Sequence, residues 1–135
     1  LNLKLISPAM NYGTLAGYHD PIKWLDEFLA QPNVSLDDIH AIAIHCYMAS
    51  PSAVKDYIKR FEKYGKPIWM TEFCAWENVS GVEQQKSYMS DVLNYFEQNP
   101  LVERYAWFMP RMNKGLNEKP YNQLLTKVNP IEWVR

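Results

Sequence analysis

The sequence predicts an α/β fold of parallel strands, as part of a (β/α)8 barrel. Apolar runs typical of buried strands alternate with segments of helical periodicity, which indicates parallel strands joined by helical crossovers. Four such strand–helix units are visible in 135 residues, whereas a complete barrel needs about 250. No glycine-rich turn follows the first strand, so the pattern disfavours a dinucleotide-binding half.

The first unit occupies about thirty residues. Residues 3–7 form an apolar run that ends at Pro8, which lacks the N–H that a strand would use. Asp20 followed by Pro21 predicts a capped helix start. The helix ends before Pro32, and its apolar face is expected to contain Ile22, Leu25, Phe28 and Leu29.

The second unit begins with the continuous apolar run 41–44, which predicts a strand covered on both faces. Ser50 and Pro51 repeat the cap-and-proline pattern, and Gly65 closes the following helix. The predicted buried face of that helix consists of Val54, Tyr57, Ile58 and Phe61.

Two further strands are predicted, at residues 67–71 and 104–109. Between them, Ser80 and Glu83 have the spacing of a capping box and predict a helix that stops before Asn99. Its buried face is expected to contain Tyr88, Met89, Val92, Leu93 and Phe96. The remaining tail contains a short helical candidate at residues 121–125.

Composition excludes several classes of function. With 14 basic and 15 acidic residues, the net charge of -1 indicates no nucleic-acid partner. The apolar runs are far shorter than the ~18 residues of a membrane span. Cys46 and Cys74 lack zinc-site spacing and are predicted to be buried thiols, so no metal is expected. No linker divides residues 1–135. Because the chain begins with Leu1 and an immediate strand, we expect its natural N-terminus to lie upstream.

Candidate functional residues gather where the predicted strands end. In parallel α/β proteins these ends carry the loops that build active sites. His45 and Tyr47 end the second strand and should share a face, as should Met70 and Glu72 in the third. The same alternation groups Tyr105, Trp107 and Met109, and Asn11 follows the first strand.

This set of side chains suits sugar hydrolysis. A carboxylate can attack or stabilise an oxocarbenium-like carbon, and a phenol or imidazole beside it can keep it ionised and oriented. An indole can pack against a sugar ring. The residues therefore predict a carbohydrate-active site around Glu72.

Three segments also resemble a known family: residues 42–47, 66–73 and 105–108. They are similar to the glycosyl hydrolase catalytic core family of clan A barrels, which includes the endo-β-1,3-glucanases of glycoside hydrolase family 128. The Pro-Ile-Trp-Met-Thr-Glu-Phe segment is the most specific part. The resemblance implies that residues 1–135 are one partial catalytic domain, the C-terminal half of the barrel with strands five to eight.

The same resemblance implies a retaining β-glucan hydrolase with Glu72 as the nucleophile. It implies substrate-binding roles for His45, Tyr47 and Trp107, and orienting Glu72 is a further role for Tyr47. Trp76 and Asn11 are weaker substrate-binding candidates, since either could serve packing or strand termination. Trp69 and Phe108 are expected to be packing residues.

The family's acid/base would lie upstream of this chain. Asn117 and Glu118 resemble its motif but follow the last strand in a polar loop, so they are not accepted as a replacement. Glu77 and Asp20 are minor candidates. The chain alone is therefore expected to be inactive or crippled, because retention needs two carboxyl groups about 5 Å apart.

The expected partner is a β-glucan polysaccharide or oligosaccharide, with no metal or organic cofactor. The alternative is a non-catalytic half-barrel that binds carbohydrate or self-associates, as a homodimer or with a complementing N-terminal half. A secreted or cell-envelope location is expected by resemblance. Four basic residues on one helix face are expected to be solvated: Lys55, Lys59, Arg60 and Lys63.

Overall fold

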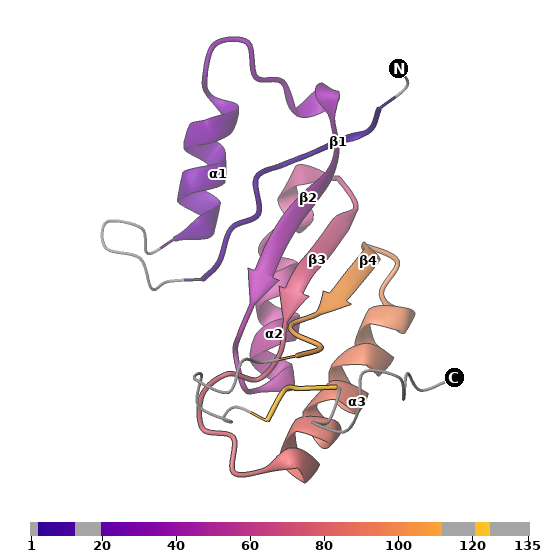
Figure 1. Ribbon diagram of the computed structural model, residues 1–135. Coiled ribbons are helices and arrows are strands. Elements are labelled where there is room, and N and C mark those ends of the chain that lie inside the picture. The colour runs from indigo at the N-terminus through magenta and orange to yellow at the C-terminus, as the bar shows by residue number, and fades with distance from the viewer. Residues whose placement is uncertain (1–2, 13–19, 112–120, 125–135) are drawn as a thin grey trace.

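The computed structural model describes residues 3–12, 20–111 and 121–124. A sheet of four parallel strands forms its centre, in the order β1-β2-β3-β4 (Figure 1). The strands are β1 (Leu5–Ile6), β2 (Ile39–Cys46), β3 (Ile68–Phe73) and β4 (Val102–Trp107). The predicted α/β class is confirmed, and the sheet is compatible with half of a barrel.

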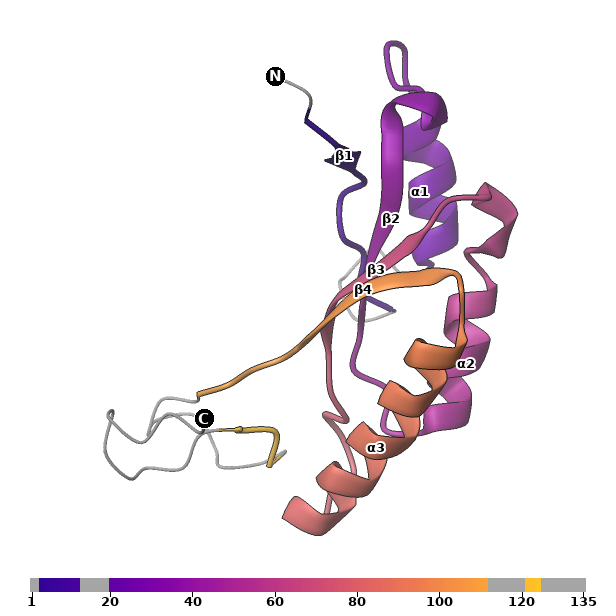
Figure 2. The same cartoon turned by 90° about the vertical axis from the view of Figure 1, so that its right-hand side faces the viewer.

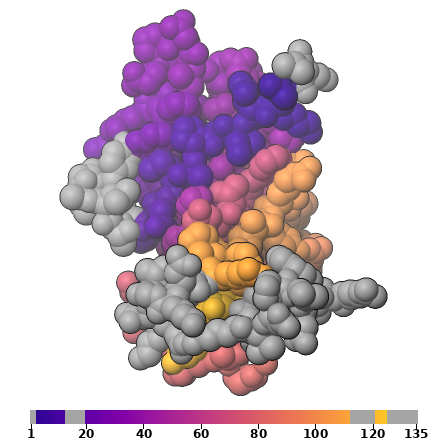
Figure 3. Space-filling model, viewed as in Figure 1, coloured from indigo at the N-terminus to yellow at the C-terminus, as the bar shows by residue number. Residues whose placement is uncertain are grey.

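Three α-helices lie on one face of this sheet, as Figure 2 shows. They are α1 (Pro21–Leu29), α2 (Pro51–Lys59) and α3 (Val82–Gln98), and short 3-10 turns occupy Leu36–Asp38 and Glu62–Tyr64. None of these helices covers the opposite face, where parts of the N-terminal segment, β3 and β4 reach the surface (Figure 3). Side chains between helices and sheet form the core, among them Ile44, Val54, Ile58, Phe61, Met70, Phe73, Val92 and Phe96.

The first strand is shorter than residues 3–7. Ser7 explains where it stops, because its amide donates to Ala41 O (3.0 Å) while its buried hydroxyl accepts from Ala43 N (2.9 Å). Pro8 then has no N–H to donate. The chain rejoins β2 at Met10, whose carbonyl accepts from His45 N (2.8 Å). This contact fixes the segment that leads to Asn11.

The predicted helix caps have mixed outcomes. Asp20 caps α1 as predicted, and its side chain accepts from Ile22 N at 2.9 Å. Ser50 precedes α2 without a side-chain cap bond. Gly65 ends the following 3-10 turn with φ of 61°, a left-handed conformation that favours glycine.

The capping box at the start of α3 was predicted wrongly. Gly81 is the N-cap residue, and no side chain caps the helix. The partner of Ser80 is Gln84 instead of Glu83: Gln84 Oε1 accepts from both the Ser80 amide (2.7 Å) and the Ser80 hydroxyl (2.8 Å). Gln84 rather than Glu83 therefore reaches back to Ser80, and Glu83 instead contacts Lys86 at 2.8 Å.

The prediction that Met70 and Glu72 share a face is also wrong. Ile44 pairs with Met70, but the next residue, His45, pairs with Glu72. Two residues of β3 thus oppose one of β2, and this irregularity reverses the alternation after Met70. Met70 is completely buried, whereas Glu72 lies beside His45 and keeps 34% of its side chain exposed.

The last strand begins and ends two residues earlier than predicted. Residues 121–124, part of the short helical candidate, are not helical, and Leu125 lies outside the described residues. Within the described ranges, no helix is both long enough and apolar enough to cross a membrane.

Candidate active site

A pocket of about 530 Å³ opens beside the C-terminal ends of the strands. Its walls come from the segments that follow all four strands, as predicted for the functional end of a parallel sheet. The lining residues are Asn11, Tyr12, Tyr47, Met48, Trp76, Glu77 and Phe108. Three of the predicted substrate-binding residues, Asn11, Tyr47 and Trp76, are therefore part of one pocket.

Glu72 lies next to this pocket and is held by two residues of the β2 end. The Tyr47 hydroxyl donates a hydrogen bond to Glu72 Oε2, and His45 Nδ1 lies 3.3 Å from the same oxygen. Among the described residues, Glu72 Oε1 has no hydrogen-bond partner. The carboxylate therefore has one oxygen anchored and one available, an arrangement that suits nucleophilic attack.

Tyr47 is a stable hydrogen-bond donor. Burial raises the pKa of its phenol, and the neighbouring Glu72 carboxylate raises that pKa further, so the proton stays on the oxygen at neutral pH. The role predicted for Tyr47 in orienting Glu72 fits this geometry.

The two cysteines are buried and free, as predicted. Burial raises the pKa of the Cys46 thiol to about 11 and that of Cys74 to about 12. Both remain protonated at neutral pH and so are poor nucleophiles.

Three aromatic rings form one wall of the site. Tyr47 contacts Trp76 and Phe108 edge to face, with ring centroids 5.6 Å apart in both pairs. Trp76 and Phe108 lie 6.3 Å apart, and 40% of Trp76 remains exposed. Phe108 was predicted to be a packing residue, so its place in the pocket is a correction. An exposed indole in an aromatic pocket that also contains Asn11 and Glu77 can receive a sugar face.

Trp107 does not line this pocket. It pairs in register with the fully buried Phe73, and their ring centroids are 5.2 Å apart. It also contacts Tyr88 of α3, and its indole N–H donates to Asn122 O at 2.7 Å. Trp107 therefore packs against Phe73 and α3 and does not line this pocket, and its substrate-binding role stays a prediction.

Two polar residues that the sequence analysis missed support the site. Gln85 is 3% exposed; its side chain accepts from Ala75 N (3.2 Å) and donates to Ala75 O (2.7 Å), which fixes the segment leading to Trp76. Buried Asn122 donates to Phe108 O at 2.7 Å. A signal for Gln85 existed, because this polar residue continues the apolar stripe of Tyr88, Val92 and Phe96.

The remaining carboxylates have distinct positions. Glu77 lines the pocket. Asp20 caps α1 and pairs with Arg60 at 2.7 Å, so it is committed to structure. Asn117 and Glu118 lie outside the described residues. Within the described ranges, no cluster of His, Cys, Asp and Glu could hold a metal ion.

The sequence matches the family described as Glycosyl hydrolase catalytic core over residues 1–133. It is 35% identical over 115 residues to alkali-sensitive linkage protein 1 of Schizosaccharomyces pombe, covering 82% of this chain and 21% of that protein.

Similar solved structures include two endo-β-1,3-glucanases of glycoside hydrolase family 128, subgroup II. The Sorangium cellulosum enzyme has a TM-score of 0.78 at 27% identity, covering 92% of this chain and 49% of that one. The Pseudomonas viridiflava enzyme has a TM-score of 0.76 at 34% identity, and the match covers 93% of this chain and 50% of that one.

A subgroup I endo-β-1,3-glucanase from Amycolatopsis mediterranei is also similar. A variant with one glutamate replaced by alanine was solved with laminaritriose and laminaribiose. It has a TM-score of 0.67 at 25% identity, and the match covers 92% of this chain and 53% of that one. The chain thus spans about half the length of these enzymes and a fifth of the fission-yeast protein.

Proposed function

The chain belongs to the glycosyl hydrolase catalytic core family, and we propose that it is the nucleophile-bearing half of a retaining β-1,3-glucan hydrolase. The observation that carries the proposal is the Glu72 carboxylate beside an aromatic pocket, anchored through one oxygen by Tyr47 and His45. This site would be the C-terminal, strand-end face of strands five to eight of a (β/α)8 barrel.

In the proposed reaction, Glu72 attacks the anomeric carbon and forms a covalent glycosyl-enzyme, which water then hydrolyses. The Tyr47 and His45 contacts orient the carboxylate for attack. A second carboxyl group, about 5 Å away in retaining enzymes, protonates the leaving oxygen and later activates the water. We assign that group to a complementing half of the barrel.

The sheet supports this assignment. Strand β1 forms one edge of the sheet, where Leu5, Ile6 and the preceding Leu3 are exposed. None of the described helices covers the face opposite α1, α2 and α3. An apolar edge of this kind favours pairing with further strands. A complementing N-terminal half is the proposed occupant, and a second copy of this chain is the alternative.

The proposed substrate is a β-1,3-glucan. The family 128 enzyme solved with laminaritriose and laminaribiose supports this choice, as do the exposed Trp76 and the polar Asn11 in the pocket. Aromatic faces and a few hydrogen-bonding groups are the usual means of sugar recognition.

A second candidate is carbohydrate binding without turnover. It is favoured by two exposed aromatic residues at the pocket, Tyr12 and Trp76, and by Glu72 as the one anchored carboxylate beside that pocket within the described ranges. Binding of this kind would use the same pocket and need no acid/base.

Reducing-sugar release from laminarin separates the two candidates, with this chain tested alone and joined to the preceding half of a family 128 domain. Turnover by the joined protein, with the β-anomer as first product in proton NMR, supports the hydrolase. Binding of laminari-oligosaccharides without turnover in both proteins supports the binding module.

A further inference from the structure

We propose that Tyr12 is a sugar-contacting residue of the pocket and that Arg60, the C-cap residue of α2, positions it; this inference rests on the proposed function. Tyr12 lines the pocket with 46% of its surface exposed. It was not among the substrate-binding residues predicted from the sequence, and Arg60 was expected to be solvated.

Two residues from α2 and its C-terminal end hold the Tyr12 ring. The Tyr57 ring meets it edge to face, with centroids 5.8 Å apart at 77°. The Arg60 guanidinium lies over it, with Cζ 5.9 Å from the ring centroid. Edge-to-face and cation–π contacts both constrain ring orientation. A ring held in this way loses little conformational entropy when a sugar packs on it.

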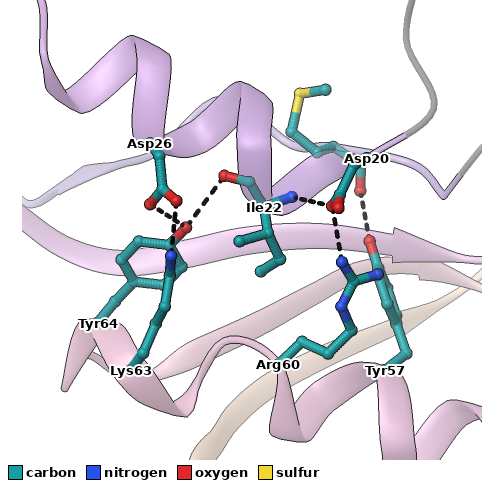
Figure 4. Close-up of polar contacts among 8 residues, drawn as sticks. Asp20, Ile22, Asp26, Tyr57, Arg60, Lys63 and Tyr64 are labelled. Carbon is teal, nitrogen blue, oxygen red and sulfur yellow. Dashed lines mark hydrogen bonds and ion pairs between the residues drawn. The ribbon is translucent and has the colours of Figure 1, made fainter.

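The backbone before Tyr12 is held by the same helix. The Tyr57 hydroxyl donates to Met10 O at 3.3 Å, the dashed line that leaves Tyr57 in Figure 4. That carbonyl also accepts from His45 N at 2.8 Å. Tyr57 therefore links α2 to the point where the chain leaves the sheet for the pocket. Tyr57 is 2% exposed, so this link is part of the core.

Arg60 also contacts Asp20, the residue that precedes α1. Its Nη2 lies 2.7 Å from Asp20 Oδ1, and the same oxygen caps α1 through Ile22 N (Figure 4). One guanidinium thus contacts both Tyr12 and Asp20, the residues that flank positions 13–19. Loss of Arg60 should free Tyr12 to leave its binding orientation.

A second ion pair provides a matched control. Lys63 Nζ lies 2.6 Å from Asp26 Oδ2, and the Tyr64 hydroxyl donates to Asp26 Oδ1 at 2.9 Å (Figure 4). This set joins the same two helical regions as Arg60 and Asp20, but neither Lys63 nor Asp26 lines the pocket. Stability effects should therefore be common to both sets, and sugar-binding effects specific to Arg60.

The test measures laminaripentaose affinity by isothermal titration calorimetry in the chain joined to a complementing family 128 half. We expect Tyr12→Ala to weaken binding about tenfold and Tyr12→Phe to retain it, because the ring makes the contact. Arg60→Met should weaken binding by about threefold to tenfold, with Arg60→Lys intermediate. Lys63→Met should leave affinity unchanged.

A double-mutant cycle distinguishes positioning from a structural role. If Arg60 acts through Tyr12, Arg60→Met does not weaken laminaripentaose binding further in a protein that already carries Tyr12→Ala. The inference is overturned if Arg60→Met lowers affinity equally in the wild-type and Tyr12→Ala proteins, or if Tyr12→Ala binds with full affinity. In either case, binding by the wild-type protein leaves the proposed function intact. A wild-type protein that neither binds nor cleaves the glucan overturns both.

Discussion

His45 Nδ1 lies 3.3 Å from Glu72 Oε2, and the register of β2 and β3 brings the two residues together. Regular alternation would have placed Glu72 with the buried Met70, facing the helices. The irregularity after Ile44 turns the carboxylate toward the strand-end pocket, where the Tyr47 hydroxyl also reaches it. The proposed nucleophile therefore depends on one extra residue in a strand.

Replacing Tyr47 with Phe should lower kcat by about tenfold to a hundredfold, because hydrogen bonds to charged groups contribute about 1.5–3 kcal/mol. Oligosaccharide affinity should change much less, since the ring stays in the aromatic wall. Tyr105→Phe is the matched control, because Tyr105 also donates to a carboxylate, that of Glu97, but does not line the pocket. Equal losses of kcat in both variants would contradict the orienting role.

Trp76→Ala should weaken laminari-oligosaccharide binding by about tenfold, because it removes an exposed aromatic face from the pocket. Fluorescence titration of the joined protein measures the effect. Trp69→Ala provides the comparison, since the Trp69 indole donates to Glu103 (2.6 Å) outside this pocket. Unchanged affinity in Trp76→Ala would remove this residue from the binding site.

Gln85→Leu should destabilise the chain by about 1–3 kcal/mol, because it leaves the buried Ala75 amide and carbonyl without their side-chain partner. Urea unfolding followed by circular dichroism measures the change. Gln84→Leu, at the exposed neighbouring position, should lower the free energy of unfolding by less. A larger loss at Gln84 would show that the Ala75 contacts contribute little.

Acid should weaken the contact between Asp26 and Lys63. The Lys63 hydrogen bond lowers the pKa of Asp26, against the raising effect of burial, and the Tyr64 hydroxyl lowers it further. Because the folded-state pKa lies below the unfolded value of about 3.9, the stabilisation is present above that pH and is lost as pH falls through the folded pKa.

Asp26→Asn should therefore be less stable than wild type at pH 7, and the difference should shrink below about pH 4. Urea titrations across this range compare the two proteins. A stability difference that stays constant down to pH 2 would contradict the assigned ionisation.

Local patterns predicted much of the fold. The apolar run at 41–44 is buried as expected, since such a run is typical of a strand covered on both faces. Asp20 caps its helix because a residue before proline favours the extended backbone of an N-cap position, from which an aspartate can accept a helix amide. The end of β1 was less predictable, since the Ser7 hydroxyl replaces a strand hydrogen bond through a contact 36 positions away.

The site was predicted less completely, because its details depend on strand pairing. The faces of Glu72 and Trp107 follow from register irregularities that leave no trace in residue spacing. Trp107 packs with Phe73 and Tyr88, so Phe108 supplies the aromatic wall instead. Arg60 lies on a polar helix face by pattern, and only the tertiary structure brings Asp20 and Tyr12 to it.

The measurement that tests the central claim most directly is covalent trapping of the joined protein with a 2-deoxy-2-fluoro-β-laminaribiosyl fluoride, followed by peptide mapping. Such reagents accumulate the glycosyl-enzyme of a retaining hydrolase. We expect the added sugar mass on Glu72 and its loss in Glu72→Gln, together with a fall in laminarin turnover of at least about a thousandfold. Labelling at another carboxylate such as Glu77, or near-wild-type turnover by Glu72→Gln, would contradict the assignment of the nucleophile.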